Sequence, residues 1–307
     1  MLSRILTRGL LATMLMLTFF SVSALSETNS ALVTTEWLAK QMDDPNLVIL
    51  DCTVKMMPDG KGGMQSISGF EDYQAGHIPS AGFADLKTSL CDVSSEMNFA
   101  MPTAEQFCEL MGKLGVGDDS RVVLYDGFNS VWAARVWWML RWVGFDNAVI
   151  LDGGFKAWKA EDRPVSTKPA THAAKKLIPI VRPSLISYKD EVLGGIEDDG
   201  VVIMDAMPEM HYTGKMVMYG RPGHIPTAVN VSAMAILDST GHYLPREQLA
   251  AMFDFGKKSR VIIYCGAGVA ASSNAFVLTR LGYEDVAVYM ASLQEWAADP
   301  EMPLVVE

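Results

Sequence analysis

The residue best suited to chemistry in this 307-residue chain is Cys265, which ends an apolar run and opens a glycine-containing turn. The segment after it consists of Gly266, Ala267, Gly268, Val269 and Ala270, and an alanine-rich helical pattern follows. Two glycines let the backbone turn tightly with amide N–H groups facing the sulfur, and the start of a helix adds partial positive charge. Both features stabilise a thiolate, the nucleophilic form of cysteine. The pattern predicts a nucleophilic cysteine, although a structural cysteine in a glycine turn has the same local sequence.

The other three cysteines lack such a setting. Cys52 ends an apolar run and Cys108 lies on the apolar face of a predicted helix, so we expect both of them, and Cys91, to be structural. None of the four cysteines forms a Cys-x-x-Cys pair or stands beside a histidine at zinc spacing, so we predict no metal site. An oxidising compartment would permit a disulfide among Cys52, Cys91 and Cys108, and the sequence leaves its pairing open.

The elements that position Cys265 belong to an internal repeat of roughly half the chain. Five landmarks recur in the same order: residues 47–51 and 201–205, 76–79 and 223–226, 101–107 and 244–249, 121–125 and 260–264, and 154–158 and 292–296. The sequence Tyr-Asp-Gly around Asp126 corresponds to Tyr-Cys-Gly around Cys265. The chain is therefore predicted to contain two domains of one design, with Asp126 in the place of the cysteine in the first.

Short β-branched runs alternate with longer helical patterns in each copy. This alternation predicts an α/β fold in which each domain has a mostly parallel sheet with helices on both faces. Ligands of such folds bind beyond the carboxyl ends of the strands, where Asp126 and Cys265 would lie. We expect a first domain at 25–160, a linker at 161–184 that holds four prolines, and a second domain at 185–307.

The repeat, the two Gly-His-Ile-Pro motifs, the Tyr-Asp-Gly and Tyr-Cys-Gly pair and Ala133-Ala-Arg-Val-Trp-Trp138 resemble tandem rhodanese-domain sulfurtransferases over residues 32–298. That family includes thiosulfate and 3-mercaptopyruvate sulfurtransferases, whose second domain is catalytic and whose first carries aspartate. The resemblance implies that Cys265 takes sulfur from a small donor as a persulfide and passes it to a thiophilic acceptor, such as cyanide, a thiol or a protein dithiol. It also implies that residues 266–270 cradle the persulfide, that the first domain is a scaffold, and that no cofactor is needed.

The choice of sulfur donor stays open in the sequence. Thiosulfate enzymes of this family carry basic residues after the cysteine, where this chain has Gly266 and Ala267. Mercaptopyruvate enzymes have a serine or threonine in place of Ala267 and arginines before the second Gly-His-Ile-Pro, where this chain has one arginine, Arg221. The loop therefore leans towards a mercaptopyruvate-like donor.

Two side chains are candidates for contact with the donor. Arg221 could bind its anionic end, and the alternative is a plain surface arginine. His77 could face a cleft between the domains and protonate the donor, or it could be a hydrogen-bonded turn residue. We expect His224, in the second Gly-His-Ile-Pro, to be structural and Arg135 to pair with a carboxylate.

The first 24 residues have the pattern of a cleaved signal peptide. Arg4 and Arg8 precede an apolar run at 10–20, which is too short to span a bilayer, and small residues lead to a cleavage site after Ala24. We therefore expect a periplasmic or secreted protein with no stable membrane association after cleavage, and a periplasmic protein thiol is a further candidate acceptor. The net charge of −11 and the lack of a basic run argue against nucleic acid as a partner.

Three other functions were weighed. A cysteine phosphatase needs an arginine that closes the loop after its cysteine, and residues 266–272 contain none. Met207, Met210, Met216 and Met218 lie near His211 and could bind Cu(I), although methionine more commonly fills apolar gaps. An exported persulfide carrier with slow turnover would need the same Cys265 chemistry, so the sequence does not separate it from an enzyme.

Overall fold

The computed structural model describes residues 31–60, 63–127, 129–257 and 259–307, and Ala31–Glu307 forms one compact unit. The predicted signal peptide at 1–24 lies outside the described residues. No helix in those four ranges has the length and apolar character needed to cross a membrane.

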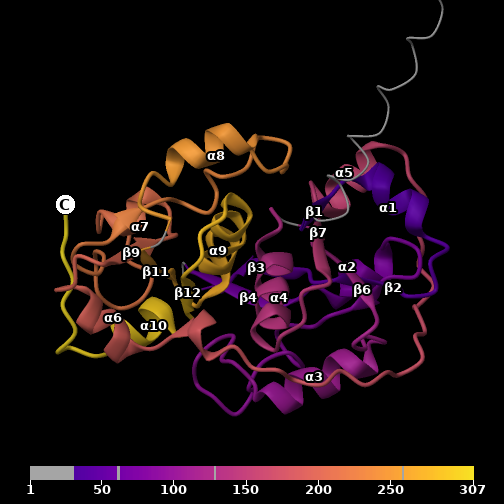
Figure 1. The fold of residues 1–307 in the computed structure, drawn as a ribbon, viewed down its shortest axis with the longest axis horizontal. Coiled ribbons are helices and arrows are strands. Elements are labelled where there is room, and N and C mark those ends of the chain that lie inside the picture. The colour runs from indigo at the N-terminus through magenta and orange to yellow at the C-terminus, as the bar shows by residue number, and fades with distance from the viewer. Residues whose placement is uncertain (1–30, 61–62, 128, 258) are drawn as a thin grey trace, which may run out of the picture. The chain divides into compact units, whose positions relative to one another are not determined.

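The first domain is built on a five-stranded parallel sheet (Figure 1). Its strands lie in the order β1 (Leu32–Val33), β7 (Ala148–Leu151), β6 (Arg121–Tyr125), β2 (Leu47–Asp51) and β5 (Gly82–Phe83). Its helices are α1 (Thr35–Gln41), α2 (Phe70–Ala75), α3 (Ala104–Lys113), α4 (Val131–Trp142) and α5 (Gly154–Ala160). An antiparallel hairpin of β3 (Val54–Pro58) and β4 (Met64–Ser68) follows β2, and our sequence analysis did not predict it.

Side chains of β2 alternate between two buried clusters because successive residues of a strand point to opposite faces of the sheet. Val48 and Leu50 belong to the cluster that contains the buried residues of α3 and α4. Leu47 and Ile49 belong to the other cluster, together with buried residues of α1 and α5. Helices therefore cover both faces of this sheet.

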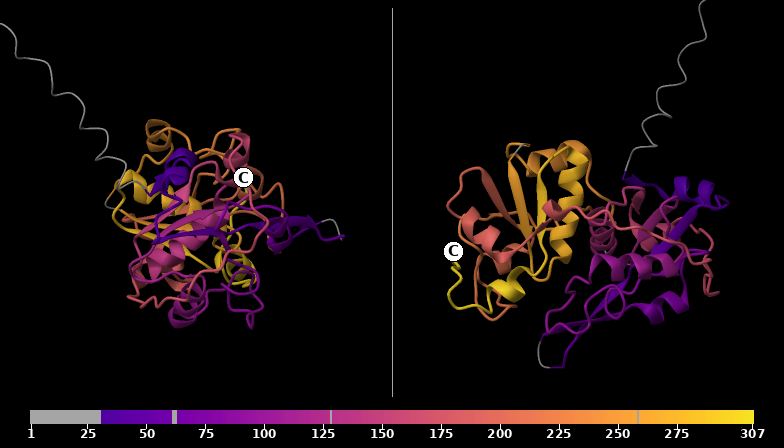
Figure 2. Two further views of the ribbon diagram at one scale, coloured as in Figure 1. Left: turned by 90° about the vertical axis from the view of Figure 1, so that its right-hand side faces the viewer. Right: turned by 60° about the horizontal axis from the view of Figure 1, so that its bottom comes forward.

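The second domain repeats the plan strand by strand. Its parallel sheet has the order β8 (Ile186–Ser187), β12 (Val286–Tyr289), β11 (Arg260–Tyr264), β9 (Val201–Asp205) and β10 (Val229–Asn230). Its helices are α6 (Lys189–Gly195), α7 (Glu209–Tyr212), α8 (Arg246–Met252), α9 (Val269–Leu281) and α10 (Ser292–Trp296), after a 3-10 helix at Pro183–Leu185. Figure 2 shows this domain in orange to yellow and the first in indigo to magenta. The predicted fold of two α/β domains with parallel sheets is confirmed.

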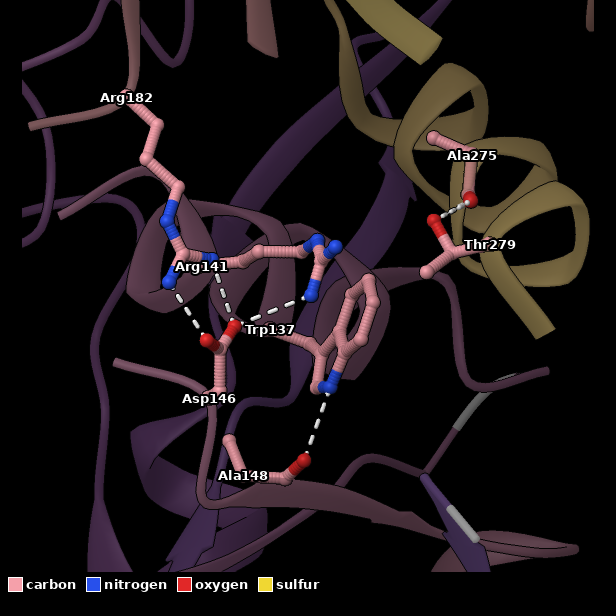
Figure 3. Close-up of polar contacts among 7 residues, drawn as sticks. All are labelled: Trp137, Arg141, Asp146, Ala148, Arg182, Ala275 and Thr279. Carbon is pink, nitrogen blue, oxygen red and sulfur yellow. Dashed lines mark hydrogen bonds and ion pairs between the residues drawn. The ribbon is translucent and has the colours of Figure 1, made fainter. Parts of the chain in front are cut away.

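Helices α4 and α9 pack against each other and join the two domains. Residues 131–140 of α4 are all buried, as expected for a helix that protein surrounds on every side. Trp137 of α4 meets Phe276 of α9 edge to face, with ring centroids 4.9 Å apart, and its Nε1–H donates to the Ala148 carbonyl at 2.9 Å (Figure 3). This packing places side chains of α4 within reach of the second domain.

The segment between the domains is fastened to the end of α4. The N–H of Ile180 donates to the Val143 carbonyl at 2.8 Å. Arg182 donates to both oxygens of Asp146 at 2.7 and 2.5 Å, and Arg141 of α4 donates to the same carboxylate at 3.0 Å (Figure 3). The Asp146 carboxylate thus links the segment between the domains to α4, the helix that packs against the second domain.

Candidate active site

Cys265 lies directly after β11, the middle strand of the second sheet, and its side chain is only 2% exposed. Helix α9 begins at Val269, after Gly268 in the left-handed region with φ +73°. Asp126 has the same place after β6 in the first domain, where α4 begins at Val131 after Ser130 with φ +56°. The first-domain turn is one residue longer. Asp126 and Cys265 therefore occupy corresponding positions, each between the middle strand of its sheet and the helix that follows.

The Asp126 carboxylate is held by the first turn of α4. Its Oδ1 accepts the N–H of Ser130 at 3.0 Å, and its Oδ2 accepts those of Trp132 and Ala133, each at 2.9 Å. Three backbone donors on one buried carboxylate form a site for negative charge at a helix N-terminus. Cys265 is the corresponding residue between β11 and α9 in the second domain.

Ser292, the first residue of α10, clamps the turn after Cys265. Its Oγ accepts the N–H groups of Cys265 and Gly268, each at 3.1 Å, and donates to the Tyr289 carbonyl at 2.7 Å. Ser292 is fully buried with φ +55°, a left-handed conformation that Gly154 adopts at the equivalent place with the same φ. Sequence analysis did not single out Ser292. The available signal was a serine at a place where the first copy has glycine.

Tyr219, from the segment between α7 and β10, covers the same turn. A Cβ added to Gly266 would lie 1.9 Å from the Tyr219 hydroxyl oxygen, so a larger residue at that position would force the tyrosine side chain to move. Burial, and then the neighbouring Cys265, raise the pKa of the Tyr219 phenol, which keeps it protonated near neutral pH. Within the described part of the chain this hydroxyl has no hydrogen-bond partner, so it is free to donate to a ligand.

Arg135 of α4 reaches the Cys265 turn from the first domain. Its Nη1 donates to the Gly268 carbonyl at 3.3 Å, and its Nη2 donates to the Phe99 carbonyl at 2.8 Å. The expectation that Arg135 pairs with a carboxylate is wrong, since no carboxylate among the described residues lies within ion-pair distance of it. The physical reason is that the packing of α4 on α9 directs this side chain towards the second domain.

His77 is fully buried in the turn after α2. Its Nδ1 lies 2.7 Å from the Tyr73 carbonyl oxygen and its Nε2 lies 2.9 Å from that of Lys168, while its ring stacks on Tyr73. His224 stacks on Tyr212 in the same way, with Nδ1 2.8 Å from the Tyr212 carbonyl oxygen. Both ring nitrogens of His77 are thus occupied by the backbone, which favours the structural role over donor protonation.

Arg221 fastens the C-terminal segment. Its guanidinium donates to four backbone carbonyls at 2.7 to 3.2 Å, those of Trp296, Ala297, Asp299 and Met302. These bonds occupy Nε and Nη2, which favours a structural role for Arg221 over a role in binding the donor.

The remaining cysteines lie in settings that suit structural roles. All four cysteines are free. Burial raises the pKa of Cys108 to about 11 and also raises those of Cys52 and Cys91, so these thiols stay protonated near neutral pH.

The methionine group before the second Gly-His-Ile-Pro divides in two. Met207 is buried in the core, whereas Met210, Met216 and Met218 are exposed. In the described ranges, no cluster of His, Cys, Asp and Glu side chains is arranged to hold a metal ion.

The model of the rhodanese-like domain matches residues 34–161 and 188–299, so the chain belongs to the rhodanese-like domain family. Thiosulfate/3-mercaptopyruvate sulfurtransferase 2 of Arabidopsis thaliana is 33% identical over 91% of this chain and 87% of its own length. Thiosulfate sulfurtransferase of Rattus norvegicus is 32% identical, over 88% of this chain and 94% of its own. The crystal structure of SseA from Escherichia coli, described as a 3-mercaptopyruvate sulfotransferase, has a TM-score of 0.75 at 29% identity and covers 86% of this chain and 98% of its own.

These relatives place the chain among the thiosulfate and 3-mercaptopyruvate sulfurtransferases, which confirms the resemblance drawn from its repeated motifs.

Proposed function

We propose that Cys265 carries sulfur as a persulfide between a small donor and a thiophilic acceptor. The observation that carries the proposal is the corresponding position of Asp126 and Cys265 in the two domains. In the first, a negative Asp126 side chain receives three helix N–H groups, and in the second, Cys265 stands at the same place. A site that holds a carboxylate anion also suits a thiolate or a persulfide anion.

The reaction is a double displacement at one sulfur. The Cys265 thiolate attacks the sulfur that the donor gives up, a bond from its Sγ to that sulfur forms, and the bond between that sulfur and the rest of the donor breaks. The leaving group keeps the electron pair of the broken bond. An acceptor nucleophile then attacks the outer sulfur, and the Cys265 thiolate returns. Sulfur is transferred with no net oxidation of the protein.

The surroundings of the turn support a mercaptopyruvate-like donor over thiosulfate. Gly266 and Ala267 carry no charge, Ala267 is buried, and the Tyr219 side chain occupies the space beside Gly266. Arg221 is occupied by backbone carbonyls. A site without an exposed cation at the turn disfavours a dianion, whereas the neutral Tyr219 hydroxyl can donate to a carbonyl or enolate oxygen.

The proposal also includes the location of the protein and the kind of acceptor that receives the sulfur. We infer a periplasmic or secreted protein that begins at Leu25 and passes sulfur to a small thiol or to a protein thiol of that compartment. N-terminal sequencing of the protein made in its native host tests the first part, and an N-terminus at Met1 would contradict it.

Intact mass spectrometry tests the persulfide directly. Reduced protein is incubated with 3-mercaptopyruvate or with thiosulfate, beside Cys265→Ser and a matched Cys108→Ser control. We expect one added sulfur atom in wild type and Cys108→Ser, its loss on adding cyanide or a thiol, and no gain in Cys265→Ser. No gain with either donor in protein whose Cys265 is reduced would refute the proposal. A stable persulfide that acceptors remove only slowly would instead identify a carrier.

A further inference from the structure

Arg135 is the only lysine or arginine that is buried among the described residues, at 1% exposure. It lies on α4 of the domain without the cysteine, yet it contacts the turn that follows Cys265. Burying a basic side chain costs free energy unless an opposite charge or hydrogen bonds compensate for the lost hydration.

All hydrogen-bond acceptors of Arg135 are neutral. Nη1 donates to the Gly268 carbonyl and contacts the Met290 sulfur, while Nη2 donates to the Phe99 carbonyl and lies 3.4 Å from the Met101 sulfur. Its Nε–H has no partner within the described part of the chain. The guanidinium is therefore enclosed by carbonyl dipoles and thioethers, with no anionic side chain bonded to it.

Three other arginines of this protein have carboxylate partners. Arg141 and Arg182 share Asp146, and Arg260 pairs with Glu191 and Asp285. A buried charge without a partner costs several kcal/mol after relaxation of the protein. Among the lysines and arginines of the described ranges, Arg135 alone is buried, and it has no carboxylate partner, which points to an anion that is present during the reaction.

The titratable groups that face Arg135 are thiols. Burial lowers the pKa of Arg135 to about 10, and the nearby Cys265 and Cys91 act in the opposite direction, as anions would. Cys91 lies on a loop of the first domain, whereas Cys265 follows β11 of the second. Tyr219 is the other titratable group that faces Cys265.

The guanidinium is also fixed against the turn sterically. A Cβ added to Gly268 would lie 2.7 Å from Nη1 of Arg135 and 2.6 Å from the Met290 carbonyl oxygen. Gly268 is therefore required both by its φ of +73° and by the arginine packed on it. Because Gly268 immediately precedes α9, the positive charge is held beside the helix start that follows Cys265.

We propose that Arg135 is the counter-charge for the anionic sulfur on Cys265, both as thiolate and as persulfide. The inference rests on the proposed function. Arg135 acts through the turn and through its charge rather than by touching the donor, so it is a positioning residue. The first domain then has a part in the chemistry beyond that of a scaffold, because it supplies the cation that the catalytic domain lacks at this turn.

The test measures how the rate of Cys265 alkylation by iodoacetamide depends on pH, with the Cys265 peptide followed by mass spectrometry. Arg135→Met and Arg135→Gln remove the charge, and Arg135→Lys keeps it. Arg141→Met is the matched control, since it removes a partly buried arginine from the same helix, and Cys91→Ser removes the other facing thiol. Thermal melting shows that each variant is folded.

We expect the neutral variants to shift the half-maximal pH of alkylation upward by about one unit or more, as loss of a nearby opposite charge does. Arg135→Lys, Arg141→Met and Cys91→Ser should keep the wild-type profile. A folded Arg135→Met or Arg135→Gln with the wild-type profile would overturn the proposal, and so would an equal shift in Arg141→Met. A shift in Cys91→Ser that matches Arg135→Met would show that packing around Cys265, rather than the charge of Arg135, sets the profile, and would also overturn the proposal.

A second measurement covers the case in which both neutral variants fail to fold. Cys265→Asp puts a permanent anion at the position, as Asp126 does in the first domain, and Cys265→Asn is its neutral match. We expect Cys265→Asp to be at least as stable as Cys265→Asn in urea at pH 7, and a much less stable Cys265→Asp would overturn the proposal. Neither the alkylation measurement nor the urea measurement needs a sulfur donor. Failure of the wild-type protein to load sulfur would therefore contradict the proposed function without deciding the role of Arg135.

Discussion

Replacing Ser292 by alanine removes one hydroxyl that serves three backbone groups around Cys265. The N–H groups of Cys265 and Gly268 lose their acceptor, and the Tyr289 carbonyl loses its donor. All three bonds are buried, and a buried polar group left without a partner costs about 1–3 kcal/mol. We expect Ser292→Ala to lower the free energy of unfolding by about 3–5 kcal/mol, since part of the loss relaxes.

Ser292→Gly separates the hydroxyl from the backbone conformation. Both variants lack the hydroxyl, but glycine adopts the φ of +55° freely, as Gly154 does at the equivalent place, whereas alanine is strained by about 1 kcal/mol. The glycine variant should therefore be about 1 kcal/mol more stable than the alanine variant. Ser187→Ala is the control, because Ser187 is a buried serine of the same domain whose hydroxyl has no partner in the described residues.

Urea unfolding followed by circular dichroism gives the stabilities, and the initial rate of sulfur loading by intact mass gives the effect on Cys265. We expect Ser187→Ala to stay within about 0.5 kcal/mol of wild type. Loading by folded Ser292→Ala should fall at least about tenfold, since the turn that holds the sulfur is no longer fixed. The reasoning fails if Ser292→Ala matches Ser187→Ala in stability and loads sulfur at the wild-type rate.

Three further changes have definite expected results. Burial raises the pKa of Asp205 to about 6, so its carboxyl favours folding fully below about pH 4 and loses that contribution as pH rises through 6. The free energy of unfolding of Asp205→Asn, measured in urea, should therefore rise relative to that of wild type by up to about 3 kcal/mol between pH 4 and 7. A difference between the two proteins that stays constant with pH would contradict this. Gly266→Ala should lower the initial rate of sulfur loading at least about tenfold, because the added methyl group collides with Tyr219. Adding Tyr219→Ala should restore most of that rate. A double variant that loads sulfur no faster than Gly266→Ala would exclude the collision. Asp126→Ala should lower the free energy of unfolding, measured in urea, by about 3 kcal/mol, because three backbone N–H groups lose their acceptor. Cys265 of this variant should still take up sulfur. A folded variant that takes up none would show that Asp126 does more than hold its turn.

The sequence was sufficient for features that repeat or that are local. The order of apolar runs and Gly-His-Ile-Pro motifs predicted two α/β domains, and both sheets have the same strand order. It also predicted that Asp126 and Cys265 follow equivalent strands. These inferences succeed because strand periodicity, glycine turns and helix starts depend on neighbouring residues.

The roles of single charged residues were harder to assign. Arg221 and His77 looked available for a donor, but backbone carbonyls far along the chain occupy them: Arg221 bonds the 296–302 segment, and His77 reaches Lys168. No local pattern encodes such bonds, because carbonyl acceptors are present at every residue. Composition therefore proposes candidate ligands, and only the three-dimensional path of the backbone shows which of them are already occupied.

The sequence by itself determined the domain repeat and the fold class, and it predicted Cys265 rather than the other three cysteines as the nucleophile. Only the tertiary structure decided what surrounds that cysteine, namely Ser292 beneath its turn, Tyr219 over Gly266 and Arg135 against Gly268. Arg135 is separated from Gly268 by 133 positions and lies in the other domain. Such neighbours are set by how α4 packs on α9 and by the path of the segment that carries Tyr219 to Gly266. These contacts depend on the shapes of distant side chains rather than on local spacing.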